Sequence, residues 1–155
     1  MDKRQQEKPR RIVPPVYMFA SIALMVVLDW LSPFGFKAGP LLWGFGGCFI
    51  SLGVFLDIYC ALLFKKANTG IVPFHEATSV VETGPYKITR NPMYVGMVLI
   101  QLGVVVILGN LLAFLPLVVF VWIIQKNFIE GEEGYMEATL GQPYIDYKSR
   151  VRRWI

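Results

Sequence analysis

Apolar residues occur along the chain in four blocks that carry almost no charge: Val13–Leu31, Leu41–Phe64, Met93–Leu108 and Leu111–Ile129. A membrane-spanning helix needs roughly 20 apolar residues, with a range of about 17–25. Three blocks reach that length, and the third falls short by a residue or more. The pattern predicts one all-α integral membrane domain over residues 1–155, with four transmembrane helices at about 13–31, 41–64, 92–108 and 111–130 and a cytosolic tail at 131–155.

Composition supports a membrane protein. The chain is 55% hydrophobic and only 17% charged, below the roughly 25% charge of soluble domains. The charged lead Met1–Arg11 is followed by no small-x-small cleavage site, so we expect no removable signal peptide. Cys48 and Cys60 fall inside the second block and read as buried thiols. His75 is the single histidine, and no zinc-site spacing accompanies it, so we predict no metal.

Lysine and arginine positions predict the orientation. Of the 15 such residues, all but Lys37 fall before the first block, between the second and third, or at and after the end of the fourth. By the positive-inside rule both termini are then cytoplasmic, in a multi-pass protein such as those of the bacterial inner membrane. The net charge of +4 fits attraction to anionic lipid headgroups and needs no nucleic acid as partner.

The connection between the second and third blocks, Ala67–Asn91, is too long for an idle loop. Gly84-Pro85 predicts a turn, and Asn91-Pro92 predicts a helix start with asparagine as N-cap. Arg90 then stands at the lip of a helix N-terminus, where its planar fork suits a carboxylate or phosphate. The alternative is that Arg90 only extends toward lipid headgroups.

An acidic cluster is predicted to face this lip. Gly109-Asn110 joins the third and fourth blocks in a tight hairpin, so residues equidistant from it lie at similar depth. Glu130, Glu132 and Glu133 then come to lie beside Arg90 at about 1.5 Å of rise per residue. Together they form a bipolar pocket suited to a zwitterionic ligand. The alternative is a plain solvated helix face.

The end of the chain carries an apolar stripe with helical spacing, made of Met136, Leu140, Tyr144, Tyr147, Val151 and Trp154. Gly141 and Pro143 predict a break within it. The second piece reads as an interfacial helix that caps the pocket, or, alternatively, as a simple surface anchor.

These residues resemble the isoprenylcysteine carboxyl methyltransferase and phospholipid methyltransferase superfamily of integral membrane enzymes. The first motif is matched by Gly84, Pro85, Tyr86, Lys87, Arg90, Asn91, Pro92, Met93, Tyr94 and Gly96. The second is matched by Glu132, Glu133, Met136, Leu140, Gly141, Tyr144, Tyr147, Val151 and Arg153. Two positions depart from the pattern. Asn91 stands where many members carry histidine, which removes a titrating group, and Met136 replaces leucine at similar volume.

The resemblance implies S-adenosylmethionine as methyl donor, bound at the cytosolic end of the hairpin. It implies cofactor contacts from Pro85, Tyr86, Arg90, Asn91, Pro92, Tyr94, Gly96, Glu132, Glu133, Tyr144 and Tyr147. As catalytic residues we expect Arg90, which would hold an anion, and Glu133, which would take a proton from an amine acceptor. A carboxylate acceptor would need no base. The acceptor is expected to be lipid-like and to enter between helices.

Two other readings stay open at this point: a membrane reductase with a nicotinamide cofactor in a related pocket, and a small non-catalytic membrane protein. Asp57, an acid inside the second block, is expensive to bury in a membrane and reads as functional or as paired with Lys65 or Lys66. His75 reads as a loop hydrogen-bonder or, less readily, as a catalyst. The identity of the acceptor and the oligomeric state are not encoded in any pattern we recognise.

Overall fold

The computed structural model describes residues 13–32, 35, 38–67 and 79–155. Apart from one isolated bridge between Thr89 and Arg152, the regular structure of this part is helical. The prediction of an all-α protein is therefore confirmed. His75 and Lys37, on which two of the sequence predictions depend, lie outside the described residues.

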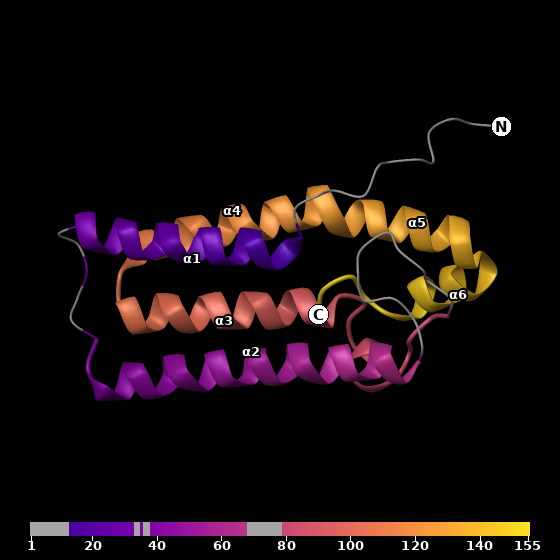
Figure 1. The fold of residues 1–155 in the computed structure, drawn as a ribbon, viewed down its shortest axis with the longest axis horizontal. Coiled ribbons are helices and arrows are strands. Elements are labelled where there is room, and N and C mark those ends of the chain that lie inside the picture. Colours follow the sequence, from indigo (N-terminus) through magenta and orange to yellow (C-terminus); the bar gives the residue numbers. More distant parts are fainter. Residues whose placement is uncertain (1–12, 33–34, 36–37, 68–78) are drawn as a thin grey trace.

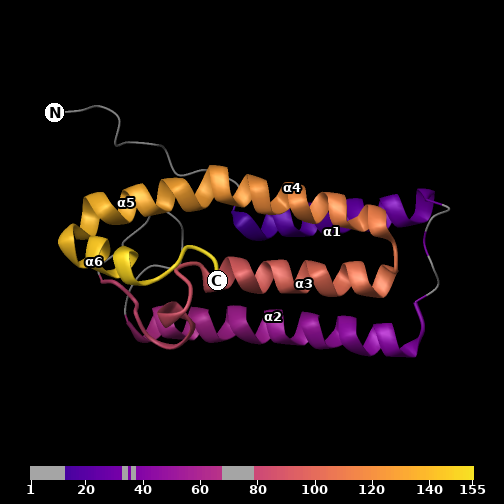
Figure 2. The same ribbon diagram turned by 180° about the vertical axis from the view of Figure 1, so that it is seen from behind.

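Long helices run side by side in a flat antiparallel bundle (Figures 1 and 2). They are α1 (Pro14–Leu31), α2 (Pro40–Lys66), α3 (Pro92–Leu108) and a last rod made of η3 (Leu111–Ala113), α4 (Phe114–Ile124), a π-helical turn (Gln125–Ile129) and α5 (Glu130–Leu140). The central helix is α3, with α2 on one side and α1 and α4 on the other. The short η2 (Gly84–Lys87) and α6 (Gln142–Arg150) lie at the end where α2 finishes and α3 begins.

Within the described residues, three helices are long and apolar enough to cross a membrane: Pro14–Leu31, Pro40–Lys66 and Leu111–Leu140. The fourth predicted span, α3, is apolar but only 17 residues long. At about 1.5 Å per residue it covers about 25 Å, slightly less than the roughly 30 Å hydrocarbon core. Length and composition thus support a membrane protein with these three helices as candidate spans, and α3 as a fourth span stays a prediction.

The last rod is longer than its sequence suggested. We expected a helix that ends near residue 130, but the rod continues to Leu140 and has 30 residues. Glutamate is a good helix former, and Gly141 is the first residue here with a positive φ, at 62°. A rod of about 45 Å exceeds the membrane core by about 15 Å. We therefore take Leu111–Ile129 as the membrane-spanning part and place α5 outside it.

The tail keeps the predicted break but not the predicted helix. Helix α6 starts after Gly141, with Pro143 in its first turn, as expected. It ends at Arg150, whereas the apolar stripe predicted helix up to Trp154. The tail beyond Val151 instead pairs with the motif loop, because the Arg90 N–H donates to the Arg152 carbonyl at 2.9 Å. This backbone pairing satisfies groups that a further helical turn would have used.

Glycines allow α2 and α3 to approach closely. A Cβ on Gly53 would lie 2.5 Å from the Gly96 carbonyl oxygen, and one on Gly103 would lie 2.5 Å from the Gly46 carbonyl oxygen. These glycines sit seven residues apart on each helix, so the contact repeats every two turns. In a membrane the hydrophobic effect does not drive helices together. Small residues instead let the helix backbones come close enough to gain van der Waals contacts. The close seam fixes α3 against α2 and thereby positions the loop that precedes α3.

Candidate active site

The Gly84-Pro85 turn forms a single 3-10 turn wedged between α2 and α6. Gly84 has φ +60°, and a side chain there would meet Leu63 and Tyr59 at 3.1 Å. Tyr86 is buried, and its ring lies 5.4 Å from that of Phe64. The Tyr147 hydroxyl donates to the Tyr86 carbonyl at 2.8 Å. Two of the four tyrosines named by the resemblance, Tyr86 and Tyr147, therefore take part in one contact, which ties α6 to the turn.

The start of α3 is held by the tail rather than by its own cap. Pro92 opens the helix as predicted, but the Asn91 side chain makes no capping hydrogen bond. Its Nδ2 donates to the Arg153 carbonyl at 2.9 Å, and the Thr89 hydroxyl donates to the same oxygen at 3.1 Å. The backbone N–H of Asn91 donates to Thr89 Oγ1 at 3.1 Å. Asn91 thus positions the tail across the helix N-terminus.

Glu133 is the centre of a buried charge cluster. Arg90 Nη2 lies 3.0 Å from its Oε1, and Arg153 donates to both oxygens, from Nε at 3.0 Å and from Nη2 at 2.9 Å. Lys148 Nζ lies 3.7 Å from Oε2. The hydrogen bond to Glu133 raises the pKa of Arg153. Both oxygens of Glu133 are in contact with cations. This arrangement favours a role in positioning Arg90 and Arg153 over the proton-accepting role expected from sequence.

Arg90 keeps donor capacity that no described residue uses. Its side chain is only 8% exposed, and its Nε and Nη1 are buried without a hydrogen-bond partner in the described part of the chain. A buried donor without a partner costs roughly 1–3 kcal/mol, and more when it is charged. Such donors are rare unless a water or a ligand satisfies them. These free donors of the guanidinium are therefore suited to an anionic group.

Glu132 faces α3 beside this cluster. Tyr94 donates its hydroxyl hydrogen bond to Glu132 Oε1 at 2.7 Å. Burial raises the pKa of Glu132 to about 7, the Tyr94 hydrogen bond lowers it, and the nearby Glu133 adds to the rise. Unlike Glu133, this carboxyl group has no cationic partner among the described residues. Burial therefore makes the Glu132 carboxyl group easier to protonate than an exposed glutamate.

The hairpin argument is confirmed for two of its three glutamates. Glu132 and Glu133 meet the start of α3, as equal depth predicted. Glu130 lies on the outer face instead and pairs with Lys126 at 2.8 Å. Tyr144 is buried beside the cluster, and burial, with a smaller effect of Glu133, raises its pKa to about 12.

Gly96 and Arg153 differ from what sequence reasoning expected. Gly96 faces Asp57 and Gly53 across the α2–α3 seam rather than the charge cluster. Arg153, which we did not count among the site residues, binds Glu133 through two nitrogens. Its place as the last matched position of the second motif was the signal for this role.

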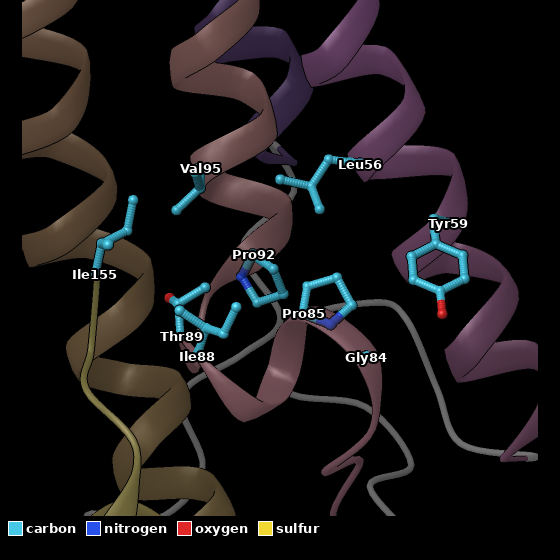
Figure 3. A pocket seen from close by; sticks show the side chains of 9 residues that line it. All are labelled: Leu56, Tyr59, Gly84, Pro85, Ile88, Thr89, Pro92, Val95 and Ile155. Atoms are coloured by element: carbon cyan, nitrogen blue, oxygen red, sulfur yellow. The ribbon is translucent and has the colours of Figure 1, made fainter.

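An apolar pocket of about 420 Å³ lies next to the cluster, between α2, the start of α3 and the tail. Figure 3 shows Pro85 and Pro92 in its middle, with Leu56 of α2 and Val95 of α3 nearby and Ile155 on the side of the tail. Gly84, Ile88, Tyr59 and Thr89 complete the lining. Thr89 precedes Arg90, so one wall of the pocket is continuous with the charged site.

These features define a helical membrane protein with a buried ionic cluster and an apolar pocket together at one end. Its sequence matches the model of the phospholipid methyltransferase family over residues 42–143, more than half of the chain. The chain belongs to this family, within the wider group that includes the isoprenylcysteine methyltransferases, as the two motifs predicted.

Curated relatives agree with this assignment. The chain is 27% identical to protein-S-isoprenylcysteine O-methyltransferase B of Arabidopsis thaliana, over 86% of this chain and 71% of that enzyme. It is 28% identical to the rat protein-S-isoprenylcysteine O-methyltransferase, over 80% of this chain but only 40% of that enzyme. An uncharacterized Haemophilus influenzae protein is 41% identical over 41% of this chain and all of its own length. The family and the two named methyltransferases indicate a membrane methyltransferase.

Proposed function

We propose that this protein transfers a methyl group from S-adenosylmethionine to a lipophilic acceptor at the cytosolic face of the membrane. The observation that carries the proposal is the ion pair of Arg90 with Glu133. It joins the two motifs of the family from distant parts of the chain, at a helix N-terminus that adjoins an apolar pocket.

The residues present fit a zwitterionic cofactor. The unpartnered Nε and Nη1 of Arg90 are N–H donors that could each give a charge-assisted hydrogen bond to an anionic group such as a carboxylate. Glu132 would accept hydrogen bonds from an ammonium group or from ribose hydroxyls, while Asn91 and Glu133 hold the surrounding backbone and cations in place. Tyr86, Tyr94, Tyr144 and Tyr147, with Pro85 and Pro92, would enclose the adenosine side, whereas Gly96 packs in the α2–α3 seam. When bound, S-adenosylmethionine supplies an electrophilic methyl group on a sulfonium.

The acceptor's apolar part would occupy the pocket of Figure 3, whose walls are almost wholly hydrocarbon. The Arabidopsis and rat relatives are named as O-methyltransferases of protein S-isoprenylcysteine, which supports an acceptor with an apolar isoprenyl part. A carboxylate acceptor attacks without losing a proton. An amine acceptor must lose one, and Glu132, with its pKa near 7, suits that task better than the fully paired Glu133.

The cytosolic assignment rests on charge. The end of the bundle that holds the site also holds Lys65, Lys66, Lys87 and Lys148, and lysine-rich ends face the cytosol. A soluble methyl donor would reach the site from that side. The acceptor would arrive from the bilayer.

A binding experiment tests the proposal. The full chain, purified in a neutral detergent, is titrated calorimetrically with S-adenosylmethionine and, in parallel, with NADPH. We expect saturable binding of S-adenosylmethionine only, and transfer of its labelled methyl group into a lipid extract. Binding of NADPH alone would indicate a reductase, and binding of neither would indicate a non-catalytic protein.

A further inference from the structure

Two polar side chains lie in the hydrophobic core of the bundle, each on a different helix. Gln101 of α3 is 0% exposed and Ser21 of α1 is 9% exposed. The Ser21 hydroxyl oxygen and Gln101 Oε1 are buried and have no hydrogen-bond partner in the described part of the chain. Gln101 Nε2 donates to the Met97 carbonyl oxygen at 3.4 Å, a long bond that uses one of its two N–H groups. Neither side chain belongs to the site described above.

Packing places the two side chains opposite each other. Helices α1 and α3 are parallel, since both run away from the end that holds the site (Figure 1). Met18 of α1 shares one buried cluster with Met97 of α3, and Met25 shares another with Val105. The serine lies three residues after Met18 and four before Met25, and the glutamine lies four residues from each of the two α3 residues. These spacings put both polar groups on the contacting faces and at a similar depth.

The surroundings of the pair are apolar and close to the middle of both helices. Ser21 is the eighth of the 18 residues of α1, and Gln101 is the tenth of the 17 residues of α3. Helix α4 covers this level with Phe120 and Ile124, which are 2% and 0% exposed. In the hydrocarbon region of a membrane an unsatisfied polar group is costly, because no bulk water is there to satisfy it. Both groups therefore need a partner that lies inside the bundle.

We propose that one water molecule is bound between Ser21 and Gln101, halfway along the bundle. It donates a hydrogen bond to Gln101 Oε1 and accepts one from the Ser21 hydroxyl. A buried water normally makes two to four such bonds. Water is the ligand that fits, because large apolar side chains from three helices surround the position and favour the smallest molecule that can both donate and accept.

The water would connect α1 to the helix that carries part of the site. In a membrane the hydrophobic effect does not hold helices together, so polar links between them matter for their placement. Met18 of α1 packs in the same cluster as Tyr94 of α3, whose hydroxyl donates to Glu132. The bridged pair therefore keeps α1 against the side of the site. This inference does not depend on the proposed function.

Solid-state NMR of the full chain in lipid bilayers tests for the water directly. Magnetisation is transferred from water protons to isotope-labelled glutamine, and the build-up of each side-chain amide signal is followed. Gln101→Met identifies the Gln101 signal by its loss. Although Gln101 is fully buried, its signal should build up at a rate comparable to that of the exposed Gln142. In Ser21→Ala the rate should fall several-fold, because the water loses one of its two partners.

Stability measurements test whether the two residues act together. Ser21→Ala and Gln101→Met each leave the remaining polar group with an incomplete set of partners, so each should lower the thermal midpoint by several degrees. The double variant has no polar group at this position and should lose less than the sum of the two single variants. Ser51→Ala is the matched control, since Ser51 is an exposed serine of α2. Its midpoint should stay unchanged.

Three outcomes would overturn the proposal. Slow build-up of the Gln101 signal in wild type would exclude a water, and if the variants were still coupled it would indicate a direct bond between the two side chains. Fast build-up that Ser21→Ala leaves unchanged would place the water away from Ser21. Stability losses that simply add in the double variant would show that the two residues share no partner.

Discussion

The carboxyl group of Asp57 in α2 occupies the space that a side chain at Gly96 in α3 would need. A Cβ on Gly96 would lie 2.0 Å from Asp57 Oδ1 and 2.9 Å from the Gly53 carbonyl oxygen. Asp57 Oδ1 is buried and has no hydrogen-bond partner among the described residues. Gly96, the last glycine of the first family motif, is therefore required by packing. Because Gly96 has no side chain, Asp57 fits between α2 and α3 while the two helices remain in close contact.

Gly96→Ala should destabilise the protein markedly. The added methyl group must displace either a backbone carbonyl or the Asp57 carboxyl group, and overpacking of this kind costs about 1–3 kcal/mol. Thermal unfolding of purified protein in detergent should show a midpoint lower by at least about 3 °C. Gly47→Ala is the control, because nothing lies within 4 Å of a Cβ at that position of α2. Its midpoint should stay the same or rise.

A second variant separates the two contacts at Gly96. In Asp57→Ala the carboxyl group is gone, so the added methyl group of Gly96→Ala meets only the Gly53 carbonyl oxygen. The double variant should therefore lose less than the sum of the two single variants. If the stability losses of the two single variants simply add in the double variant, Asp57 does not occupy the space beside Gly96.

Arg90→Lys should abolish most methyl transfer and leave stability nearly unchanged. Lysine can keep the ion pair with Glu133, but it cannot present the free Nε and Nη1 donors to a second anion. A hydrogen bond to a charged group contributes about 1.5–3 kcal/mol, so we expect about ten- to hundredfold weaker S-adenosylmethionine binding. Labelled-methyl transfer into a lipid extract measures the activity. Arg150→Lys serves as control, and equal activities of the two variants would show that Arg90 takes no part in the reaction.

Glu133→Gln should unfold the site end, a consequence that sequence alone did not reveal. Removing one partner of a buried ion pair costs about 3–5 kcal/mol, since Arg90 would remain buried without compensation. We expect a midpoint lower by several degrees and faster proteolysis of the tail beyond Gly141. The partly exposed Glu137→Gln, which also loses a contact to Lys148, should have little effect. Similar midpoints for both variants would contradict the organising role of Glu133.

Periodicity and spacing predicted much of this structure. Apolar block lengths gave the main helices, and the short Gly109-Asn110 hairpin placed Glu132 and Glu133 beside the start of α3. These predictions succeed because they depend on local geometry, namely the rise per residue and a tight turn. The prediction that the helix ends near residue 130 was wrong. It treated the start of the charged sequence as the end of the helix, although glutamates continue a helix readily.

The tail and the seam could not be predicted in the same way. The stripe at Val151 and Trp154 fits a helix locally, but the free carbonyls of Arg152 and Arg153 find donors in Thr89, Arg90 and Asn91. That competition involves residues more than 60 positions apart. The place of Asp57 against Gly96 also depends on the register of two helices, which no single segment encodes.

Topology provides a further prediction. With Cys48 and Cys60 replaced, a cysteine at position 87 and one at position 39 should be labelled by an impermeant maleimide from opposite sides of the membrane. Lys87 lies at the end that holds the site and Gly39 at the start of α2, at the other end of the bundle. In inverted vesicles position 87 should react and position 39 should be protected. Labelling of both from one side would contradict a membrane-spanning α2.

Glu132 should make the stability of the protein depend on pH. Its pKa rises from about 4.5 when exposed to about 7 in the folded protein, chiefly because it is buried. The folded state then binds the proton more tightly than the unfolded state, so stability falls as the pH rises from about 4.5 to about 7 and changes little beyond. Each unit is worth at most about 1.4 kcal/mol, which corresponds to a total fall of several degrees in the unfolding midpoint. Glu132→Gln should flatten this fall and melt higher than wild type at pH 8, whereas the exposed Glu130→Gln should keep the wild-type slope. A midpoint of wild type that rises across this range would show that Glu132 is stabilised in its charged form.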